Sequence, residues 1–499
     1  MDGARVARTG KARWTSFRPA HCFQRANGCS LSLEPNAVRA TGWSAVLDGG
    51  FSVAPAAGGR YFSRALSNPP ELNIGLVGAG VVGGGVVKNL TRNADLLADR
   101  LGIRLRLKWV CDKDPSRLAA VALPDAAKTA DAQQVLADPD VPIVVELVGG
   151  TGFAKKLILD ALSRGKIVVT ANKALLAHHG EEIFAAAARH KTNLFYEASV
   201  AGGIPIIKTL REGFVANHFP LIYGIVNGTC NYILSRMSAE GKDFSEVLAE
   251  AQRLGYAEAD PGLDIDGIDT AHKATILASL AHGFWTGYDN TYVEGIRHVS
   301  QMDIQVAREL GYAIKLLAII KSTDGAVEVR VHPTLIPQRH VLASVNGVFN
   351  AVAVRGDVVG DTMFYGRGAG ADATSSAVIA DLADAALNLK FGSVQRIPAF
   401  VSHRLHARLR TIDDVESRYY LRLTVEDRAG VIAKISKVLG DAQISIASVL
   451  QRESDTNIVP LIMMLHTARD RAVRDAVAEI DRLDVVKDKT VVLRVESFD

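Results

Sequence analysis

A short stretch near the middle of the chain gathers carboxylates in front of a lysine. Glu258, Asp264 and Asp269 precede Lys273 within sixteen residues. The apolar spacing of residues 271–280 predicts a helix, which would place Asp269 and Lys273 four positions apart on one face. An ordinary helical ion pair, worth ~0.3 to 0.5 kcal/mol, would have the same spacing. A lysine held among carboxylates can also bind an anion or relay a proton to and from an alcohol oxygen. The helix alone does not choose between these roles.

A glycine-rich turn near residue 80 has the setting of a dinucleotide-binding loop. A buried strand is expected over residues 71–77 and a helix over 84–90. Between them, one glycine permits a tight turn, a second lets the backbone approach a pyrophosphate, and a third lets helix and strand pack closely. The N-terminus of the helix then faces the phosphates. The loop residues expected to bind the cofactor are Gly78, Gly80, Val81, Val82 and Gly83.

The second strand, expected over residues 105–110, leads to Asp112, where dinucleotide-binding folds place the acid that grips the adenosine ribose. A plain turn aspartate at the strand end is the alternative. Lys113 and Arg117 follow closely and would suit the 2′-phosphate of NADP, whereas Asp112 would repel that phosphate. The sequence therefore predicts NAD or NADP as cofactor and leaves the choice open.

Several segments in a fixed order resemble the homoserine dehydrogenases. Besides the glycine turn, they are VELVGG at 145–150, TANKAL at 170–175, YEASVAGGIP at 196–205, VNGTCNYIL at 226–234, GYAE at 255–258 and DIDGIDTAHK at 264–273. The resemblance implies an NAD(P)-dependent oxidoreductase that interconverts L-homoserine and L-aspartate 4-semialdehyde, on the route to threonine, methionine and isoleucine. No aspartate kinase segment precedes the glycine turn, so we expect a monofunctional enzyme.

The resemblance implies roles for individual side chains. Lys273 resembles the acid/base lysine of the family, and Lys173 the lysine beside cofactor and substrate; with Asp269 they are the expected catalytic residues. Glu258 and Asp269 resemble the carboxylates that hold the substrate, and Asp264 a supporting acid. These roles suit homoserine, whose ammonium a carboxylate can grip and whose hydroxyl must lose a proton. The family also lines its substrate pocket with the residues matching Asn227, Gly228 and Thr229, although a plain turn is the alternative there.

Two further segments have implied ligands. In the family, a sodium ion is bound at the positions of Glu197, Val200, Gly202 and Ile204, through a carboxylate and backbone carbonyls. Oxygen ligands suit such a hard cation, whereas a simple strand exit is the alternative. Glycines also precede a helix expected over 376–387. The family returns to its nucleotide domain at this point, so Gly368 and Gly370 are expected near the cofactor, with a plain loop as the alternative.

The last eighty residues have the pattern of a separate module. Strands are expected over 419–425, 444–449, 458–465 and 490–495, with helices over 432–439 and 469–482. This order resembles the ACT domains, which bind amino acids at paired interfaces. In homoserine dehydrogenases that carry one, threonine is the usual inhibitor. We therefore expect an amino-acid effector here, with threonine suspected, and keep a dimerisation module without a ligand as the alternative.

Composition agrees with a multidomain enzyme. The chain has 499 residues, which is more than a single hydrophobic core usually contains. Its net charge of +3 gives no reason to expect nucleic-acid binding. No apolar run approaches the ~20 residues of a membrane span. Four cysteines show neither a disulfide framework nor zinc spacing, which favours the cytoplasm. From the resemblance we expect a homodimer or homotetramer.

The expected fold class is α/β, with a Rossmann-like nucleotide domain, an inserted α/β substrate-binding and dimerisation domain, and a C-terminal ferredoxin-like ACT domain. Residues 1–68 are rich in arginine and poor in acids. They suit a disordered segment, an organelle transit peptide or, as we prefer, translated upstream sequence. The other expected ranges are 69–171 with about 355–390 for the nucleotide domain, 172–354 for the substrate domain, 391–417 for a linker and 418–499 for the ACT domain.

Overall fold

The computed structural model describes residues 69–498, apart from residues 124, 404–407 and 454. The expectations for residues 1–68 lie outside the described residues. No helix in the described ranges is both long enough and apolar enough to span a bilayer.

The first part of the chain forms a six-stranded parallel sheet with strand order β3-β2-β1-β4-β5-β6. Doubly wound dinucleotide-binding domains have this order, and their ligands lie at the carboxyl ends of the strands where the order reverses, here between β1 and β4. The strands are β1 Glu71–Val77, β2 Arg104–Cys111, β3 Ala127–Thr129, β4 Ile143–Glu146, β5 Ile167–Thr170 and β6 Leu194–Phe195.

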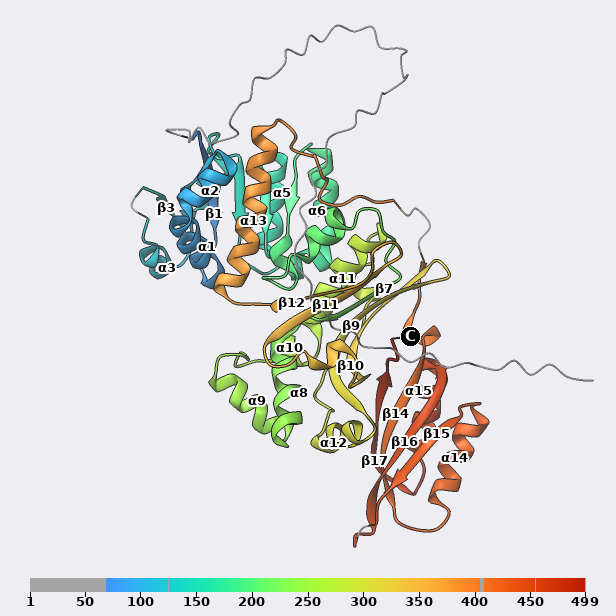
Figure 1. Ribbon diagram of the computed structural model, residues 1–499. Helices are drawn as coiled ribbons and strands as arrows, with labels where there is room; N and C mark the ends of the chain where they lie inside the picture. Colours follow the sequence, from blue (N-terminus) through green and yellow to red (C-terminus); the bar gives the residue numbers. More distant parts are fainter. Residues whose placement is uncertain (1–68, 124, 404–407, 454, 499) are drawn as a thin grey trace, which may run out of the picture. The chain divides into compact units, whose positions relative to one another are not determined.

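Helices cover both faces of this sheet, which is why most residues of its central strands are apolar and buried (Figure 1). On one face α1 packs against α13, which joins it from far along the chain. On the other face α5 packs against α6. The helices are α1 Val81–Arg92, α2 Ala94–Leu101, α3 Pro115–Ala120, α4 Ala132–Ala137, α5 Phe153–Ser163, α6 Lys173–Arg189 and α13 Ala371–Lys390.

The second part is a largely antiparallel sheet with helices packed on one face. Its strand order is β12-β11-β7-β9-β10, and the short β8 pairs with β10. The strands are β7 Leu221–Ile225, β8 Tyr292–Val293, β9 Tyr312–Thr323, β10 Ala326–Pro337, β11 Phe349–Gly356 and β12 Gly360–Arg367. The helices are α7 Ile206–Lys208, α8 Gly228–Glu240, α9 Phe244–Arg253, α10 Gly262–Ile265, α11 Ile268–His282 and α12 Gln301–Glu309.

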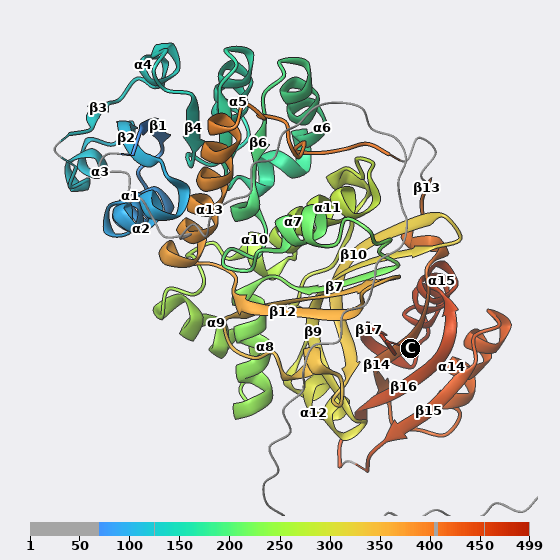
Figure 2. The same cartoon turned by 45° about the horizontal axis from the view of Figure 1, so that its top comes forward.

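The C-terminal module has the predicted β-α-β-β-α-β order, with strand order β17-β14-β16-β15. Both of its helices cover one face, where the alternating apolar residues of β14 form a core (Figure 2). Parallel pairing of β17 with β10 joins this module to the second part, so the two parts share one eleven-stranded sheet. The elements are β14 Glu416–Glu426, α14 Val431–Asp441, β15 Ile446–Gln451, β16 Ile458–Arg469, α15 Asp470–Ile480 and β17 Val486–Val495; the short β13, Arg408–Leu409, precedes them.

The structure differs from the expected ranges in three places. The nucleotide sheet continues past residue 171, because β6 pairs with β5. Residues 355–367 lie in β11 and β12 of the second sheet, and only α13 returns to the nucleotide part. Helix α1 begins at Val81, three residues earlier than expected, with Gly80 as its N-cap.

Candidate active site

A cleft of about 580 Å³ lies between the nucleotide part and the substrate part. The start of α1, the turn before α6, the start of α8, helices α10 and α11, and the loop before α13 contribute to its lining. A second cavity of about 330 Å³ shares Lys173, Glu258, Asp264 and Asp269 with the cleft. The acids and lysines predicted from the sequence therefore meet in one place.

Asp269 joins two lysines from different parts of the chain. Its Oδ2 accepts a hydrogen bond of 2.6 Å from Lys273 Nζ, and its Oδ1 lies 3.1 Å from Lys173 Nζ. Lys273 Nζ also donates to the Val226 carbonyl at 2.6 Å. Asp269 and Lys273 are one turn apart on α11, as predicted, and α11 packs against α6, which begins at Lys173. The carboxylate therefore links the nucleotide part to the substrate part.

Burial sets the protonation of this group. The side chains of Asp269 and Lys273 are only 11% and 10% exposed. Burial lowers the pKa of Lys273, since the ammonium loses its hydration. Burial would raise the pKa of Asp269, but the two neighbouring ammonium groups outweigh it and hold that pKa below its usual range. The charge of Asp269 raises the pKa of Lys173. Lys273 is therefore the lysine shifted toward the neutral amine, and Lys173 remains a cation.

The turn at the start of α8 supports the acids. Asn227 caps α8, and its amide donates to Asp264 Oδ1 at 2.7 Å and to Asp269 Oδ2 at 3.0 Å. The Thr229 hydroxyl lies 3.0 Å from Asp264 Oδ2. Gly228 lines the cleft between them. Asp264 is thus placed by side chains of the predicted pocket turn, as a supporting acid would be.

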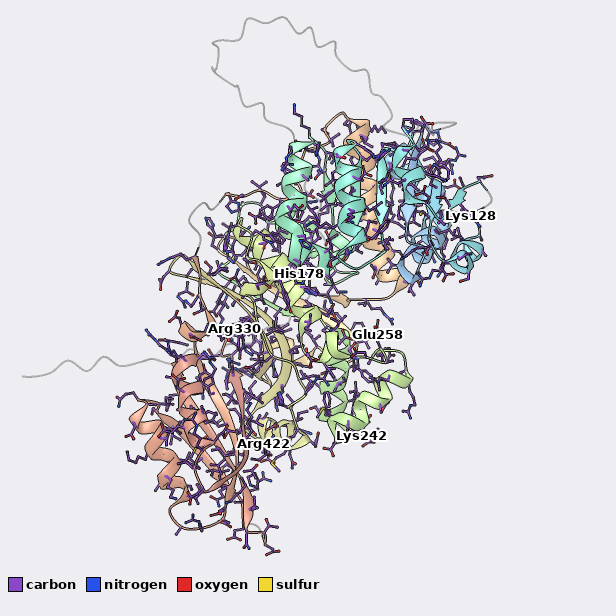
Figure 3. The ribbon with its side chains drawn as sticks, turned by 180° about the vertical axis from the view of Figure 1, so that it is seen from behind. Lys128, His178, Lys242, Glu258, Arg330 and Arg422 are labelled. Carbon is purple, nitrogen blue, oxygen red and sulfur yellow. The ribbon has the colours of Figure 1, made fainter. Side chains whose placement is uncertain are left out.

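Glu258 lines the cleft from the segment between α9 and α10 and is exposed (Figure 3). Among the described residues, no side chain or backbone amide donates a hydrogen bond to its carboxylate. Its charge nevertheless contributes to the raised pKa of Lys173. Glu258 is therefore a carboxylate that faces the site with its oxygens available to a ligand.

The glycine turn has the close contacts that a dinucleotide-binding loop requires. Gly78 has φ +104°, and a Cβ there would lie 2.5 Å from the Leu147 carbonyl oxygen. A Cβ on Gly83 would lie 1.9 Å from the Gly78 carbonyl oxygen, so helix and strand touch through backbone alone. No side chain caps the N-terminus of α1 at Gly80. Its free N–H groups therefore suit the phosphates of a dinucleotide.

Asp112 holds the glycine turn against the end of β2. Its Oδ2 accepts the Ala79 N–H at 2.8 Å, and its Oδ1 accepts the Asp114 N–H at 2.9 Å. Arg117 Nη1 lies 3.7 Å from the same carboxylate and 3.6 Å from where a Cβ on Gly80 would be. Asp112 therefore acts as the turn aspartate named above as the alternative. Each of its carboxylate oxygens still retains a lone pair that a ribose hydroxyl can use.

The segment after β6 brings Glu197 together with the loop before α13. The buried Glu197 carboxylate accepts the N–H groups of Ile207 and Lys208, at 2.9 and 2.7 Å. Burial raises the pKa of Glu197 to about 7. A Cβ on Gly202 would lie 2.5 Å from the Gly368 carbonyl oxygen, so these two glycine segments touch. Gly368 and Gly370 both line the cleft, and Gly370 is the N-cap of α13.

Some, but not all, of the backbone oxygens expected to bind a cation near Glu197 are without a hydrogen bond among the described residues. Within the described ranges, no hydrogen bond uses the carbonyls of Val200 or Gly202, whereas the Ile204 carbonyl accepts the Ile206 N–H. Those ranges contain no group of three or more His, Cys, Asp or Glu side chains placed to bind a metal. A cation at this point would therefore rest mainly on backbone oxygens.

Two positioning residues were not identified from the sequence. Glu146, fully buried at the end of β4, accepts the Val148 and Gly149 N–H groups and the Thr170 hydroxyl. Asn172 donates to the Gly150 carbonyl and caps α6. Together they fix the turn after β4 and the start of the helix that carries Lys173. Their positions at the ends of two adjacent parallel strands were the available signal.

The chain is similar to known proteins over most of its length. Residues 205–383 match the family model for homoserine dehydrogenase, residues 78–197 the model for the homoserine dehydrogenase NAD binding domain, and residues 419–485 the ACT domain model. A homoserine dehydrogenase of Neisseria gonorrhoeae is 44% identical over 431 residues, covering 86% of this chain and 99% of the relative.

Solved structures give the same result. The crystal structure of a homoserine dehydrogenase from Thiobacillus denitrificans is 44% identical, with a TM-score of 0.82 over 86% of this chain and 99% of that one. A hyperthermophilic archaeal homoserine dehydrogenase in complex with NADPH is 27% identical, with a TM-score of 0.55 over 64% of this chain and 98% of that one.

Proposed function

This chain belongs to the homoserine dehydrogenase family, and we propose that it catalyses the reversible NAD(P)-dependent interconversion of L-homoserine and L-aspartate 4-semialdehyde. The observation that carries the proposal is the buried Lys273, hydrogen-bonded to Asp269 and to the Val226 carbonyl at the wall of a cleft between the two parts. An alcohol dehydrogenation needs a group at this place that can take up and return a proton.

The contacts of Lys273 suit a proton acceptor. A neutral amine has two N–H bonds and one lone pair. The Val226 carbonyl and the Asp269 carboxylate occupy the two N–H directions. The lone pair is then left for the homoserine hydroxyl, whose proton passes to Lys273 Nζ. In the reverse direction, the same atom returns the proton to the oxygen of the reduced aldehyde.

The other charged groups of the cleft suit the two charged ends of homoserine. Glu258 offers free carboxylate oxygens for the substrate ammonium, with Asp264 supporting the turn at Asn227 and Thr229. Lys173, kept cationic by Asp269, supplies a positive charge for the substrate carboxylate. Opposite charges at the two ends orient a small amino acid in one direction, which is the protein's share of such a reaction.

A bound nicotinamide would supply the acceptor for the hydride that leaves the substrate carbon. Gly78, Gly80 and Gly83 and the free N-terminus of α1 support its pyrophosphate site, and Gly368 and Gly370 line the same cleft. NADP or NAD is the cofactor we propose: Arg117 lies beside Gly80 and Asp112 and a family member was solved in complex with NADPH, whereas the Asp112 carboxylate suits the free ribose hydroxyl of NAD. A guanidinium at this place suits the 2′-phosphate.

We also propose a sodium ion beside Glu197, held by the carbonyls of Val200, Gly202 and Ile204. The raised pKa of Glu197 supports it, because a buried carboxylate gains from a neighbouring cation.

The proposed setting is the cytoplasm, consistent with two buried free cysteines, Cys111 and Cys230. A homodimer or homotetramer is proposed on family grounds alone.

The proposed function predicts selective oxidation of L-homoserine. Purified protein with NAD⁺ or NADP⁺ should form reduced nicotinamide with L-homoserine, followed by its absorbance. L-serine, one methylene shorter, should have a kcat/KM about 10- to 200-fold lower, because a single methylene is worth that much in a fitted pocket. L-2-aminobutyrate, which lacks the hydroxyl, is the control and should give no signal. Turnover of another amino-acid alcohol without turnover of homoserine would contradict the proposal.

Threonine is the effector we propose for the C-terminal module. The module has the ferredoxin-like order of ACT domains, and its sheet continues into the substrate sheet through β10 and β17. Homoserine oxidation should therefore fall as threonine is titrated into the millimolar range, whereas D-threonine at equal concentration should have no effect. Unchanged rates across the full titration would argue against threonine and leave the dehydrogenase activity itself untouched.

A further inference from the structure

One buried arginine connects the C-terminal module to the segment of the substrate part that contacts the turn between Asp264 and Asp269. Arg494, on β17, is 2% exposed. Its Nε donates to Asp470 at 2.8 Å, within the module. Its Nη1 and Nη2 donate across the junction, to Glu294 Oε2 at 2.9 Å and to the Tyr292 hydroxyl at 3.1 Å. The guanidinium also lies over the Tyr292 ring, 4.9 Å from its centroid. One side chain therefore binds the module to the segment 292–294 of the substrate part.

That segment is itself held rigidly. Tyr292 and Val293 form β8, which pairs with β10, and the Glu294 N–H donates to the Val331 carbonyl at 2.7 Å. The Tyr292 hydroxyl donates to the Glu294 carboxylate, so both groups that meet Arg494 also bind each other. Charge-assisted hydrogen bonds of this kind are strong and geometrically specific.

The residues that follow Glu294 are in backbone contact with the turn between Asp264 and Asp269. The Ile296 N–H donates to the Ile265 carbonyl at 2.8 Å. A Cβ on Gly295 would lie 2.2 Å from the same carbonyl oxygen, so the two backbones are in direct contact. A Cβ on Gly267, between α10 and α11, would lie 3.1 Å from the Glu294 carbonyl oxygen. Asp264 and Asp269 stand on either side of this turn.

We propose that the Arg494–Glu294 ion pair is a positioning device through which the C-terminal module fixes the Asp264–Asp269 turn for homoserine binding. Neither residue lines the cleft, so both act through the backbone contacts of Gly295 and Ile296. The inference rests on the proposed function, since it concerns the affinity for homoserine. It extends that function by making the module part of the substrate site even when no effector is present.

The test compares two ion pairs that join the module to the substrate part; Figure 3 labels Arg422, the arginine of the second pair. Arg422 on β14 binds Asp303 on α12 at 2.7 Å, and Asp303 is fully buried. Arg422→Gln therefore breaks a buried junction pair without touching residues 292–297. Glu294→Gln keeps the shape of its side chain and removes only the charge that Arg494 meets. Midpoints of thermal unfolding for both variants report the general cost of weakening the junction.

Glu294→Gln should raise the KM for L-homoserine roughly 3- to 30-fold, with a smaller change in kcat and no change in the KM for the nucleotide. Arg422→Gln should leave the homoserine KM at the wild-type value, whatever its unfolding midpoint. Arg494→Lys should give a smaller rise than Arg494→Gln, because it keeps the charge. The inference is overturned by an unchanged homoserine KM in Glu294→Gln, or by an equal rise in Arg422→Gln. Inactivity of the wild type toward homoserine would instead contradict the proposed function.

Discussion

Lys273→Ala is expected to lower kcat for homoserine oxidation about 10²- to 10⁴-fold, which corresponds to about 3 to 5 kcal/mol of transition-state stabilisation. The reason is that the substitution removes the amine that Asp269 and the Val226 carbonyl hold in place as the proposed proton acceptor. Binding of the nucleotide should change little, because the glycine turn does not involve this side chain. Steady-state rates with saturating homoserine and separate nucleotide titrations measure the two effects.

A matched variant separates loss of the proton relay from loss of a buried lysine. Lys166 is also buried, and it donates to the carbonyls of Asp138 and Val141 in the nucleotide part. Lys166→Met should reduce stability and leave kcat near the wild-type value. Lys273→Met, which fills the same volume as lysine, should be as inactive as Lys273→Ala. Equal kcat values for Lys273→Ala and the wild type would refute the assigned role.

Asp269→Asn is expected to lower kcat/KM for homoserine roughly 10²- to 10³-fold, or about 3 to 4 kcal/mol. The substitution leaves Lys173 and Lys273 in the cleft without the carboxylate that separates their charges. Since the charge of Asp269 raises the pKa of Lys273, its removal lowers that pKa further. Homoserine oxidation needs the neutral amine, so its rate rises with pH through the pKa of Lys273. The rising limb of kcat against pH should therefore move to lower pH in the variant.

Asp303→Asn is the control for this pH shift. Asp303 is a fully buried aspartate that binds Arg422 and Tyr420, and it belongs to the junction with the module. Its loss should cost stability without moving the pH profile of homoserine oxidation. A profile for Asp269→Asn that rises at the wild-type pH would show that Lys273 is not the titrating base.

Local patterns predict this fold well where residues close in sequence determine the outcome. The glycine turn, the helix that carries Asp269 and Lys273, and the order of the C-terminal module all follow from spacing within short segments. The expected break at residue 171 depended on how far the sheet continues, which the pairing of β6 with β5 decides. Pairing between strands of different segments is not visible in hydrophobic periodicity.

In the site too, contacts within one helix could be predicted from the sequence, whereas contacts between distant segments could not be predicted from spacing. Asp269 and Lys273 lie on one helix, so their contact follows from spacing alone. The contact of Asp269 with Lys173 joins residues almost a hundred positions apart, and only the resemblance to a family indicated it. Arg494 had no signal of this kind, because its partners Glu294 and Tyr292 are brought to it only by tertiary folding.

The pairing of β10 with β17 over two residues of each strand limits how the proposed regulation by an amino acid can be lost. Deleting residues 418–499 would leave the side of β10 that faces β17 unpaired at Thr334 and Leu335, and it would remove Glu496, one of the two carboxylate partners of the buried Arg330. An open strand edge beside a buried guanidinium that has lost one of its carboxylate partners invites aggregation. Substitutions in the module that weaken binding of the proposed amino-acid effector would leave the pairing of β10 with β17 intact, so loss of the proposed regulation should retain the module and alter its ligand contacts.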